Sequence, residues 1–315
     1  MTKKRASIDI GTYTARLLIA GESDGRLVPV VRKRAYIRLG EGFGDAKKKS
    51  LQPEAIRRTL EALKDFSRAI EDSRAGEVLA VTTGVVREAE NRDEFLRVIR
   101  EHTGIRVRVI TGETEAALSA RGVIEALGLQ PGPLLVFDLG GGSTEFFFKG
   151  DKKPLIRSIP LGAMILTRAH LKSDPPDDGQ VRALSSHIDE ILEEGLPEFR
   201  SVDQNCFIAG TGGTVTTLAA TRYGIRVRDI CPEKLNGLTL TGEEMEAQFD
   251  GLRKMRLEER RKLPGLDPKR AEVIVAGSLA VIKTLRFFKS RTLSVSLSDL
   301  LEGLLIDSFK GEKNG

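Results

Sequence analysis

The chain has 315 residues, of which 40% are hydrophobic and 30% are charged, and its formal net charge is +5. This composition is typical of a globular protein of about two domains, and the chain contains no low-complexity tract. No apolar run approaches the roughly 18 residues that a membrane helix needs, and no basic patch is interleaved with aromatic residues. Neither a membrane nor a nucleic acid is therefore expected as a partner.

The first part of the chain predicts three strands followed by alternating helices and strands. The strands are expected over 6–11, 14–21 and 26–40, and the short turns between them make them antiparallel neighbours. A helix follows, with Pro53 at its first position and apolar residues recurring on one face up to Ile70. The next expected elements are a buried strand, a helix, an alternating strand and a helix, at 77–82, 91–104, 105–110 and 113–128.

The second part repeats this order with additional helices. Three strands are expected within 134–162, and the elements that follow alternate between helix and strand. Helices are expected at 163–172, 180–194, 214–224, 241–261, 268–289 and 299–309, and strands at 205–213 and 292–297. Two such copies predict an α/β protein with a duplicated ribonuclease-H-like, or actin-like, fold. We expect two domains, 1–123 and 124–315, with a ligand-binding cleft between them and helical insertions in the second. The final helix, about 300–315, is a candidate to pack back on the first domain.

An internal repeat supports the duplication. "SIDIGTYTARLLI" aligns with "VFDLGGGSTEFFF", and each begins with a strand that ends in an aspartate and a glycine-containing loop. Asp9 matches Asp138, Gly11 matches Gly140 and Thr14 matches Ser143. The shared strand–loop–strand context makes chance the weaker explanation.

The chemistry of these loops indicates anion binding. Glycines next to small hydroxyl residues let backbone N–H groups converge on a phosphate. The basic surplus of the chain is compatible with such a polyanion. The residues predicted to contact phosphate are Gly11, Thr12, Tyr13 and Thr14 in one loop and Gly140, Gly141, Gly142 and Ser143 in the other. Asp138 is a hard oxygen ligand suited to Mg²⁺, with Mn²⁺ as the alternative ion. The alternative is a pair of glycine-rich hairpins that bind no ligand.

A third glycine cluster lies between a strand and a helix. Its residues Gly210, Thr211, Gly212, Gly213 and Thr214 could present helix N–H groups to phosphate or ribose. The alternative is a tight turn from strand to helix.

Two charged positions complete the candidate site. Glu113 and Glu115 fall in the first turn of a helix, where they either complement the helix dipole or activate a water for attack on phosphorus. Arg87 follows a buried strand, where it either reaches phosphate or pairs on the surface with Glu88 or Glu90.

Cysteines and histidines add no site. Cys206 and Cys231 match no disulfide framework or metal spacing, so a reducing cytoplasm is expected. The three histidines are far apart in sequence and do not predict a metal site.

These motifs resemble the exopolyphosphatase / guanosine pentaphosphate phosphohydrolase family, within the superfamily of actin, sugar kinases and heat-shock chaperone ATPases. The resemblance covers nearly the whole chain and is most specific in "DLGGGSTE" and "GETEA". It implies the short form of the family, without an additional C-terminal helical domain. A homodimer is a further expectation from the resemblance.

The resemblance also implies roles for single residues. Glu115 is implied to be the base that activates the attacking water, and Glu145 to assist at the metal or the water. Asp138 is implied to bind the divalent metal, and Asp9, its counterpart in the repeat, is predicted beside it as a second ligand. Arg87 and the two loops are implied to hold the terminal phosphoryl groups.

The sequence departs from the family pattern at two places. The first loop reads Gly11-Thr12-Tyr13-Thr14 where the family has Gly-Ser-Asn-Ser, and Leu297 and Leu301 stand where the late motif has an aspartate and an arginine. The expected activity is removal of terminal phosphate from inorganic polyphosphate. Three alternatives stay open: hydrolysis of guanosine pentaphosphate, an ATP-using kinase or ATPase, and a non-catalytic sensor of polyphosphate or an alarmone.

Overall fold

The computed structural model of the chain describes residues 3–43, 49–202 and 206–313. These residues form two compact units, each described by itself below. Unit 1 comprises Met1–Gly122 and Leu300–Gly315, and unit 2 comprises Val123–Asp299. Asn205, the first residue of one predicted strand, lies outside the described residues, as do residues 1–2 and 314–315 at the ends of the predicted domains.

Unit 1 is built on a sheet of five strands in the order β3-β2-β1-β4-β5. The strands are β1 (Arg5–Ile10), β2 (Thr14–Ser23), β3 (Arg26–Tyr36), β4 (Glu77–Thr82) and β5 (Val107–Val109). β1, β2 and β3 pair antiparallel, as the short turns predict, and β4 and β5 extend the sheet in parallel. This is the strand order of a ribonuclease-H-like fold.

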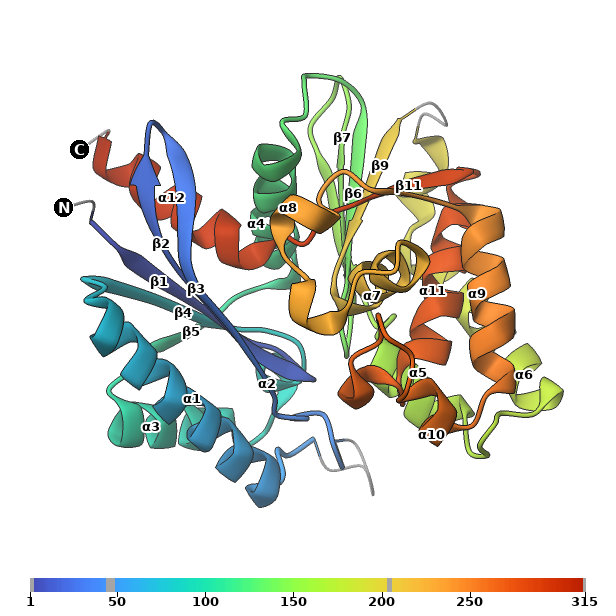
Figure 1. The fold of residues 1–315 in the computed structure, drawn as a ribbon, viewed down its shortest axis with the longest axis horizontal. Helices are drawn as coiled ribbons and strands as arrows, with labels where there is room; N and C mark the ends of the chain where they lie inside the picture. Colours follow the sequence, from blue (N-terminus) through green and yellow to red (C-terminus); the bar gives the residue numbers. More distant parts are fainter. Residues whose placement is uncertain (1–2, 44–48, 203–205, 314–315) are drawn as a thin grey trace. The chain divides into compact units, whose positions relative to one another are not determined.

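Helices cover both faces of this sheet. They are α1 (Pro53–Ser73), α2 (Val85–Glu88), α3 (Arg92–Thr103), α4 (Gly112–Leu127), which runs across the boundary between the units, and α12 (Leu300–Lys313). Alternate residues of β2 face opposite layers: Leu17 joins the core under α1, whereas Leu18 packs with Leu305 and Phe309 of α12. Figure 1 shows α12 crossing β1 and β2, so the last helix of the chain completes the core of the first unit.

Unit 2 is built on a sheet of six strands in the order β10-β11-β9-β6-β7-β8. The strands are β6 (Leu134–Leu139), β7 (Thr144–Lys149), β8 (Leu155–Ile159), β9 (Phe207–Thr211), β10 (Thr239–Thr241) and β11 (Thr292–Val295). β8, β7, β6, β9 and β11 occupy the places that β3, β2, β1, β4 and β5 occupy in unit 1. The duplicated α/β fold that the sequence predicts is therefore confirmed, with β10 added at one edge.

The helices of unit 2 surround one buried helix. They are α5 (Ala163–His170), α6 (Asp178–Gly195), α7 (Gly213–Arg222), α8 (Pro232–Leu235), α9 (Gly242–Lys254), α10 (Leu257–Arg260) and α11 (Ile274–Phe287), with 3-10 turns η2 (Pro197–Ser201), η3 (Val227–Asp229) and η4 (Pro268–Arg270). α11 is apolar almost all round and packs against α5, α6, α7 and α9. None of the helices in the described part of the chain is long and apolar enough to cross a membrane.

Some predicted elements have different limits in the structure. The helix expected over 241–261 is divided, because Met255 is extended and α10 starts anew where the Asp174 carboxylate accepts a hydrogen bond from the N–H of Leu257 at 2.8 Å. The helix expected from 268 begins as a 3-10 turn, since the side chain of Asp267 accepts from the N–H of Lys269. The distant Asp174 sets the first of these limits and the neighbouring Asp267 sets the second, and the periodicity of apolar residues locates neither.

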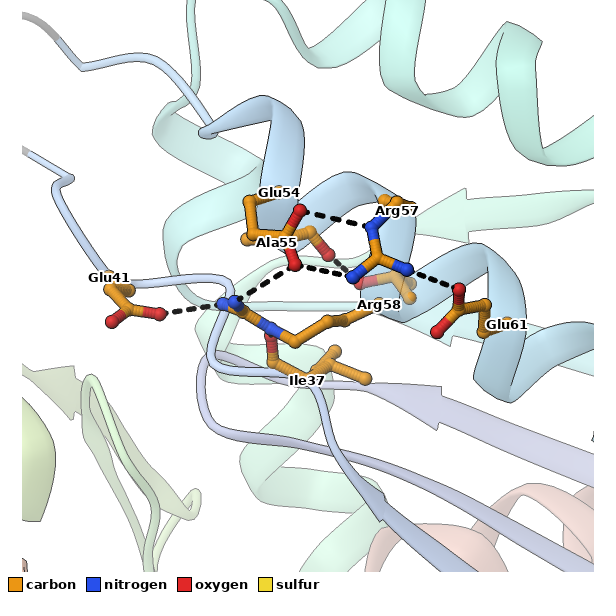
Figure 2. A network of polar contacts seen from close by, with 8 residues as sticks. Ile37, Glu41, Glu54, Ala55, Arg57, Arg58 and Glu61 are labelled. Carbon is orange, nitrogen blue, oxygen red and sulfur yellow. Dashed lines mark hydrogen bonds and ion pairs between the residues drawn. The ribbon is translucent and has the colours of Figure 1, made fainter.

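Arg58 of α1 binds the segment that follows β3 (Figure 2). Arg58 donates from Nε to the carbonyl of Ile37 at 3.1 Å and from Nη2 to Glu41 at 2.6 Å. Arg57 joins Glu54 and Glu61 on the same helix. The ends of this network are exposed and contribute little to stability, but the Arg58 bond fixes the segment that contacts the first glycine loop.

Candidate active site

The two glycine loops have the same backbone geometry. In unit 1 the N–H of Gly11 donates to the carbonyl of Thr14 at 3.0 Å, and in unit 2 the N–H of Gly140 donates to the carbonyl of Ser143 at 3.0 Å. The flanking strands also share their register, because Asp9 lies opposite Arg16 as Asp138 lies opposite Glu145. The alignment of the internal repeat is thus also a structural equivalence.

In unit 2, the carbonyls of the loop are held by the start of α5. The N–H of Ala163 donates to the carbonyl of Gly140 at 3.0 Å, and that of Met164 donates to the carbonyl of Gly141 at 2.9 Å. In contrast, the N–H groups of Gly141, Gly142 and Ser143 donate to no group within the described chain. A loop with its carbonyls bonded and these N–H groups available is suited to an anion.

Gly162 allows this close approach of α5 to the loop. A Cβ at this position would lie 2.3 Å from the carbonyl carbon of Gly142 and 2.4 Å from the carbonyl oxygen of Gly141. No side chain other than hydrogen fits without moving the loop. Gly162 was not among the residues predicted for the site, although it lies in the motif "SIPLGAMILT" that carries the family resemblance.

In unit 1, the loop is held from two sides. The carbonyl of Tyr13 accepts from the N–H groups of Ile37 and Arg38, at 3.1 and 3.0 Å, in the segment that Arg58 fixes. On the other side, the hydroxyl of Thr12 accepts from the N–H of Val85 at 3.3 Å. Gly84 has a φ of 53°, and a Cβ there would lie 2.3 Å from the Thr12 hydroxyl.

Tyr13 does not project its ring into open space beside the loop. Its side chain is only 5% exposed and packs edge-on against Tyr36, with ring centroids 5.5 Å apart. The guanidinium of Arg38 lies 5.8 Å from the ring centroid of Tyr13. The bulk that distinguishes this loop from the family pattern is therefore placed in the interior of unit 1.

Asp138 and Glu145 form a buried carboxylate pair in unit 2. They are 8% and 3% exposed, and they lie directly opposite each other on β6 and β7, so their side chains share one face of the sheet. Thr211, which is fully buried, lies beside Asp138 in the register of β9. Its hydroxyl makes no hydrogen bond within the described residues. Unit 2 thus places two carboxylates next to each other on one face of its sheet.

The third glycine cluster adjoins this carboxylate pair. Gly212 has a φ of 94°, and a Cβ there would lie 3.0 Å from Oδ1 of Asp138. At Gly213, the first residue of α7, a Cβ would lie 1.5 Å from Nη1 of Arg270. These contacts place a guanidinium over the start of α7, in the same unit as Asp138. Arg270 was not predicted, and its signal is its place in the family motif "ERRKLPGLDPKRAEVIVAG".

Glu115 and Arg87 meet in unit 1. Glu115 is 8% exposed in the first turn of α4, whereas Glu113 in the same turn is exposed. Nη1 of Arg87 lies 4.0 Å from Oε2 of Glu115 and donates to the carbonyl of Ile110 at 3.3 Å. Glu88, one of the alternative partners, is bound instead by Lys49 at 2.8 Å. Burial therefore distinguishes the two glutamates, and Arg87 is turned towards Glu115.

Comparison with known proteins identifies the family. The profile of the Ppx/GppA phosphatase family matches residues 18–312. The chain belongs to this family. Exopolyphosphatase 2 of Mycobacterium tuberculosis is 34% identical over 96% of this chain and 97% of its own length. The crystal structure of the Aquifex aeolicus member of the Ppx/GppA family superposes with a TM-score of 0.82 at 34% identity, over 100% of both chains.

A third relative is longer than this chain. The bifunctional 3-dehydroquinate synthase/phosphatase of Fusobacterium nucleatum is 31% identical over 98% of this chain, which spans only 47% of that protein.

Membership of the Ppx/GppA phosphatase family makes the chain an enzyme of the hydrolase class, as the sequence predicts.

The departures from the Ppx/GppA pattern fall on structural positions. Leu301 is 1% exposed and packs with Leu18 and Phe309 in the core of unit 1. Leu297 is half-buried, and its N–H donates to the side chain of Asn236 at 2.7 Å in unit 2. The roles that the resemblance implies for Glu115, Asp138 and Glu145 stay predictions.

The donors available to a metal ion differ between the units. Within residues 3–43, 49–202 and 206–313, no group of three or more His, Cys, Asp or Glu side chains is placed to hold a metal ion. Mg²⁺ commonly binds to only one or two carboxylates together with water and phosphate oxygens, and the Asp138–Glu145 pair fits that pattern. Asp9 is already bound by Arg16, whose Nη2 lies 2.7 Å from Oδ2. The role of Asp9 as a metal ligand stays a prediction, and unit 2 offers the better fit.

Proposed function

We propose that this protein is an exopolyphosphatase that hydrolyses the terminal phosphate of inorganic polyphosphate with the help of a divalent cation. The observation that carries the proposal is the loop at 140–143, whose available N–H groups lie on the hairpin that presents Asp138 and Glu145. The printed name of the Mycobacterium tuberculosis relative, Exopolyphosphatase 2, supports the choice of substrate.

Unit 2 is proposed to hold the terminal phosphoryl group. The N–H groups of Gly141, Gly142 and Ser143 would bind its oxygens, and Arg270 would add a positive charge at the start of α7. Asp138 and Glu145 would hold Mg²⁺ or Mn²⁺. When bound, the ion would supply positive charge that offsets the negative charge on the transferring group.

Unit 1 is proposed to supply the general base. Glu115 would accept the proton of the attacking water while that water approaches phosphorus in line with the leaving phosphate. Arg87, 4.0 Å from Glu115, would bind a phosphate oxygen. Burial of Glu115 limits its hydration and leaves it ready to accept a proton without displacing bulk water.

Replacement of the proposed base tests this assignment. Glu115→Gln should lower kcat by roughly 10²- to 10⁴-fold, the range that a general base contributes, while polyphosphate binding persists. Glu113→Gln is the matched control, because it removes an exposed glutamate from the same helical turn. A Glu115→Gln enzyme that releases phosphate at a near-wild-type rate would falsify the assignment.

The substrate is tested by parallel assays. Phosphate release with Mg²⁺ should be measured from polyphosphate, guanosine pentaphosphate and ATP, with binding of each measured alongside. Turnover of polyphosphate at the highest kcat/KM is the expected outcome. Preference for guanosine pentaphosphate or ATP would replace the proposed substrate, and binding of all three without release would establish a sensor.

A further inference from the structure

A serine on the neighbouring strand is bonded to the buried carboxylate pair of unit 2. The hydroxyl of Ser158 on β8 donates to Oε1 of Glu145 at 2.7 Å. Glu145 is 3% exposed, so this bond lies in a place where a carboxylate has few water molecules to orient it. A hydrogen bond to a charged oxygen in such surroundings is stronger than one between neutral groups.

The sheet register makes this bond part of a polar row. Ser158 lies opposite Glu145, Glu145 lies opposite Asp138, and Asp138 lies beside Thr211. Four adjacent strands thus each contribute one polar side chain to the same face, with a hydroxyl at each end and the two carboxylates between. β8 holds Ser158 in place through its own pairing with β7, so the donor is positioned by the sheet and not by a mobile loop.

Unit 1 shows that the fold itself does not demand this row. At the equivalent positions of β3, β2 and β1 stand Arg34, Arg16 and Asp9. Arg34 is exposed, and Arg16 is bound to Asp9. At this register position, a serine bonded to a carboxylate is therefore present in unit 2 and not in unit 1.

We propose that Ser158 is a positioning residue that orients Glu145 for binding of the divalent cation. The proposal rests on the proposed function, because it assigns Glu145 a part in holding the ion. Ser158 does not touch the ion or the substrate itself. It fixes one oxygen of Glu145 towards β8, so that the carboxylate does not have to find its orientation when the ion arrives.

The test measures Mn²⁺ binding to substrate-free protein by electron paramagnetic resonance of the unbound ion. Ser158→Ala should weaken Mn²⁺ binding by about 10- to 100-fold, the effect typical of losing a hydrogen-bond partner of a metal ligand. Asp138→Asn should weaken it at least as much. Ser278→Ala is the control, because it removes a buried hydroxyl in the same unit that donates to the carbonyl of Ile274 at 2.6 Å and reaches no carboxylate.

A second pair of variants separates the hydroxyl from packing. Ser158→Thr and Ser158→Val have nearly the same shape, but only threonine keeps the donor. Threonine should retain most of the Mn²⁺ affinity and valine should lose it, with similar thermal stability in the metal-free proteins. In phosphate release, the valine variant should need more Mg²⁺ for half-maximal rate and recover its kcat when Mg²⁺ is raised.

The outcomes distinguish this inference from the proposed function. If the wild-type protein binds Mn²⁺ and hydrolyses polyphosphate while Ser158→Ala and Ser158→Val bind Mn²⁺ as tightly, only the role of Ser158 is overturned. If the wild-type protein binds no Mn²⁺ and releases no phosphate, the proposed function is overturned and the role of Ser158 with it.

Discussion

Asp9 and Asp138 hold equivalent places in the two hairpins but have neighbours of opposite charge. Asp9 accepts two hydrogen bonds from Arg16, at 2.7 and 3.1 Å, whereas Asp138 lies opposite another carboxylate. An arginine next to Asp9 offsets the charge that would attract a cation, and a glutamate next to Asp138 doubles it. The repeat has thus kept one backbone shape with two different electrostatic environments.

Asparagine substitutions at Asp9 and at Asp138 test this difference in electrostatic environment. Asp138→Asn should weaken Mn²⁺ binding, because it removes one of two carboxylates. Asp9→Asn should leave Mn²⁺ binding unchanged but destabilise the protein by about 2 kcal/mol, because Arg16 loses a charged partner in a partly buried place. Metal titration and urea unfolding measure the two effects. Equal loss of Mn²⁺ affinity in both variants would show that Asp9 is a ligand, as the sequence predicts.

The histidine pair of unit 2 makes stability depend on pH. Nε2 of His170 lies 2.6 Å from Nδ1 of His187, a contact that requires at least one neutral ring. Burial, and then the charges of His187 and Lys172, lower the pKa of His170 below its ordinary value of 6.5. The unfolded chain therefore takes up this proton more readily than the folded chain.

The lowered pKa of His170 in the folded chain sets the direction in which stability changes with pH. The contribution of His170 to stability is complete above pH 6.5 and is lost as the pH falls from 6.5 through the lowered pKa of the folded state. Urea unfolding across this range should give a smaller free energy of unfolding at the acid end. His170→Gln should flatten that slope, and His102→Gln, which removes an exposed histidine of α3, should keep it. An unchanged slope in His170→Gln would contradict the assignment.

At the scale of elements, the start of α5 holds the glycine loop of unit 2, a role that its sequence does not predict. The first N–H groups of a helix are usually available to an anion. Here those of Ala163 and Met164 are used by the carbonyls of the glycine loop. The loop, and not the helix end, is therefore the element that keeps free donors.

Alanine at Gly162 should disturb this arrangement. The added methyl would meet Gly142 and Gly141 at less than the contact distance, so the loop must move away from α5. We expect KM for polyphosphate to rise about tenfold or more, as is typical when positioning groups shift by about 1 Å. Gly251→Ala is the matched control, because a Cβ at that position in α9 meets nothing within 4 Å. It should stabilise the helix by up to about 1 kcal/mol and leave KM unchanged.

The sequence predicts local features of the site but not contacts between distant segments. The hairpins at Asp9 and Asp138 follow from alternating apolar residues and a short glycine-containing turn, which are local signals. That Gly162 supports one loop, and that Arg270 covers Gly213, depends on contacts between segments far apart in the chain. Likewise, Glu115 and Glu113 are alike in the sequence and differ only in the burial that the fold imposes.

At the scale of the whole molecule, the chain returns to unit 1 for its last helix. Leu301, Leu305 and Phe309 of α12 pack with Leu18 and Ala20 of β2. Arg5 of β1 is fully buried, with its guanidinium 4.3 Å from the ring centroid of Phe309, and it also pairs with Glu77. The stability of unit 1 therefore depends on residues at both ends of the sequence.

Two compact units with separate cores should unfold in two steps. Leu305→Ala and Leu184→Ala each truncate a fully buried leucine, the first in α12 of unit 1 and the second in α6 of unit 2. Each should lower the free energy of unfolding of its own unit by about 2–5 kcal/mol and leave that of the other unit unchanged. Calorimetry should show two transitions, with Leu305→Ala lowering the midpoint of one and Leu184→Ala lowering the midpoint of the other. A single transition that both variants lower alike would mean that the two cores unfold as one cooperative body, and the polar row of unit 2 would then depend on α12 as well.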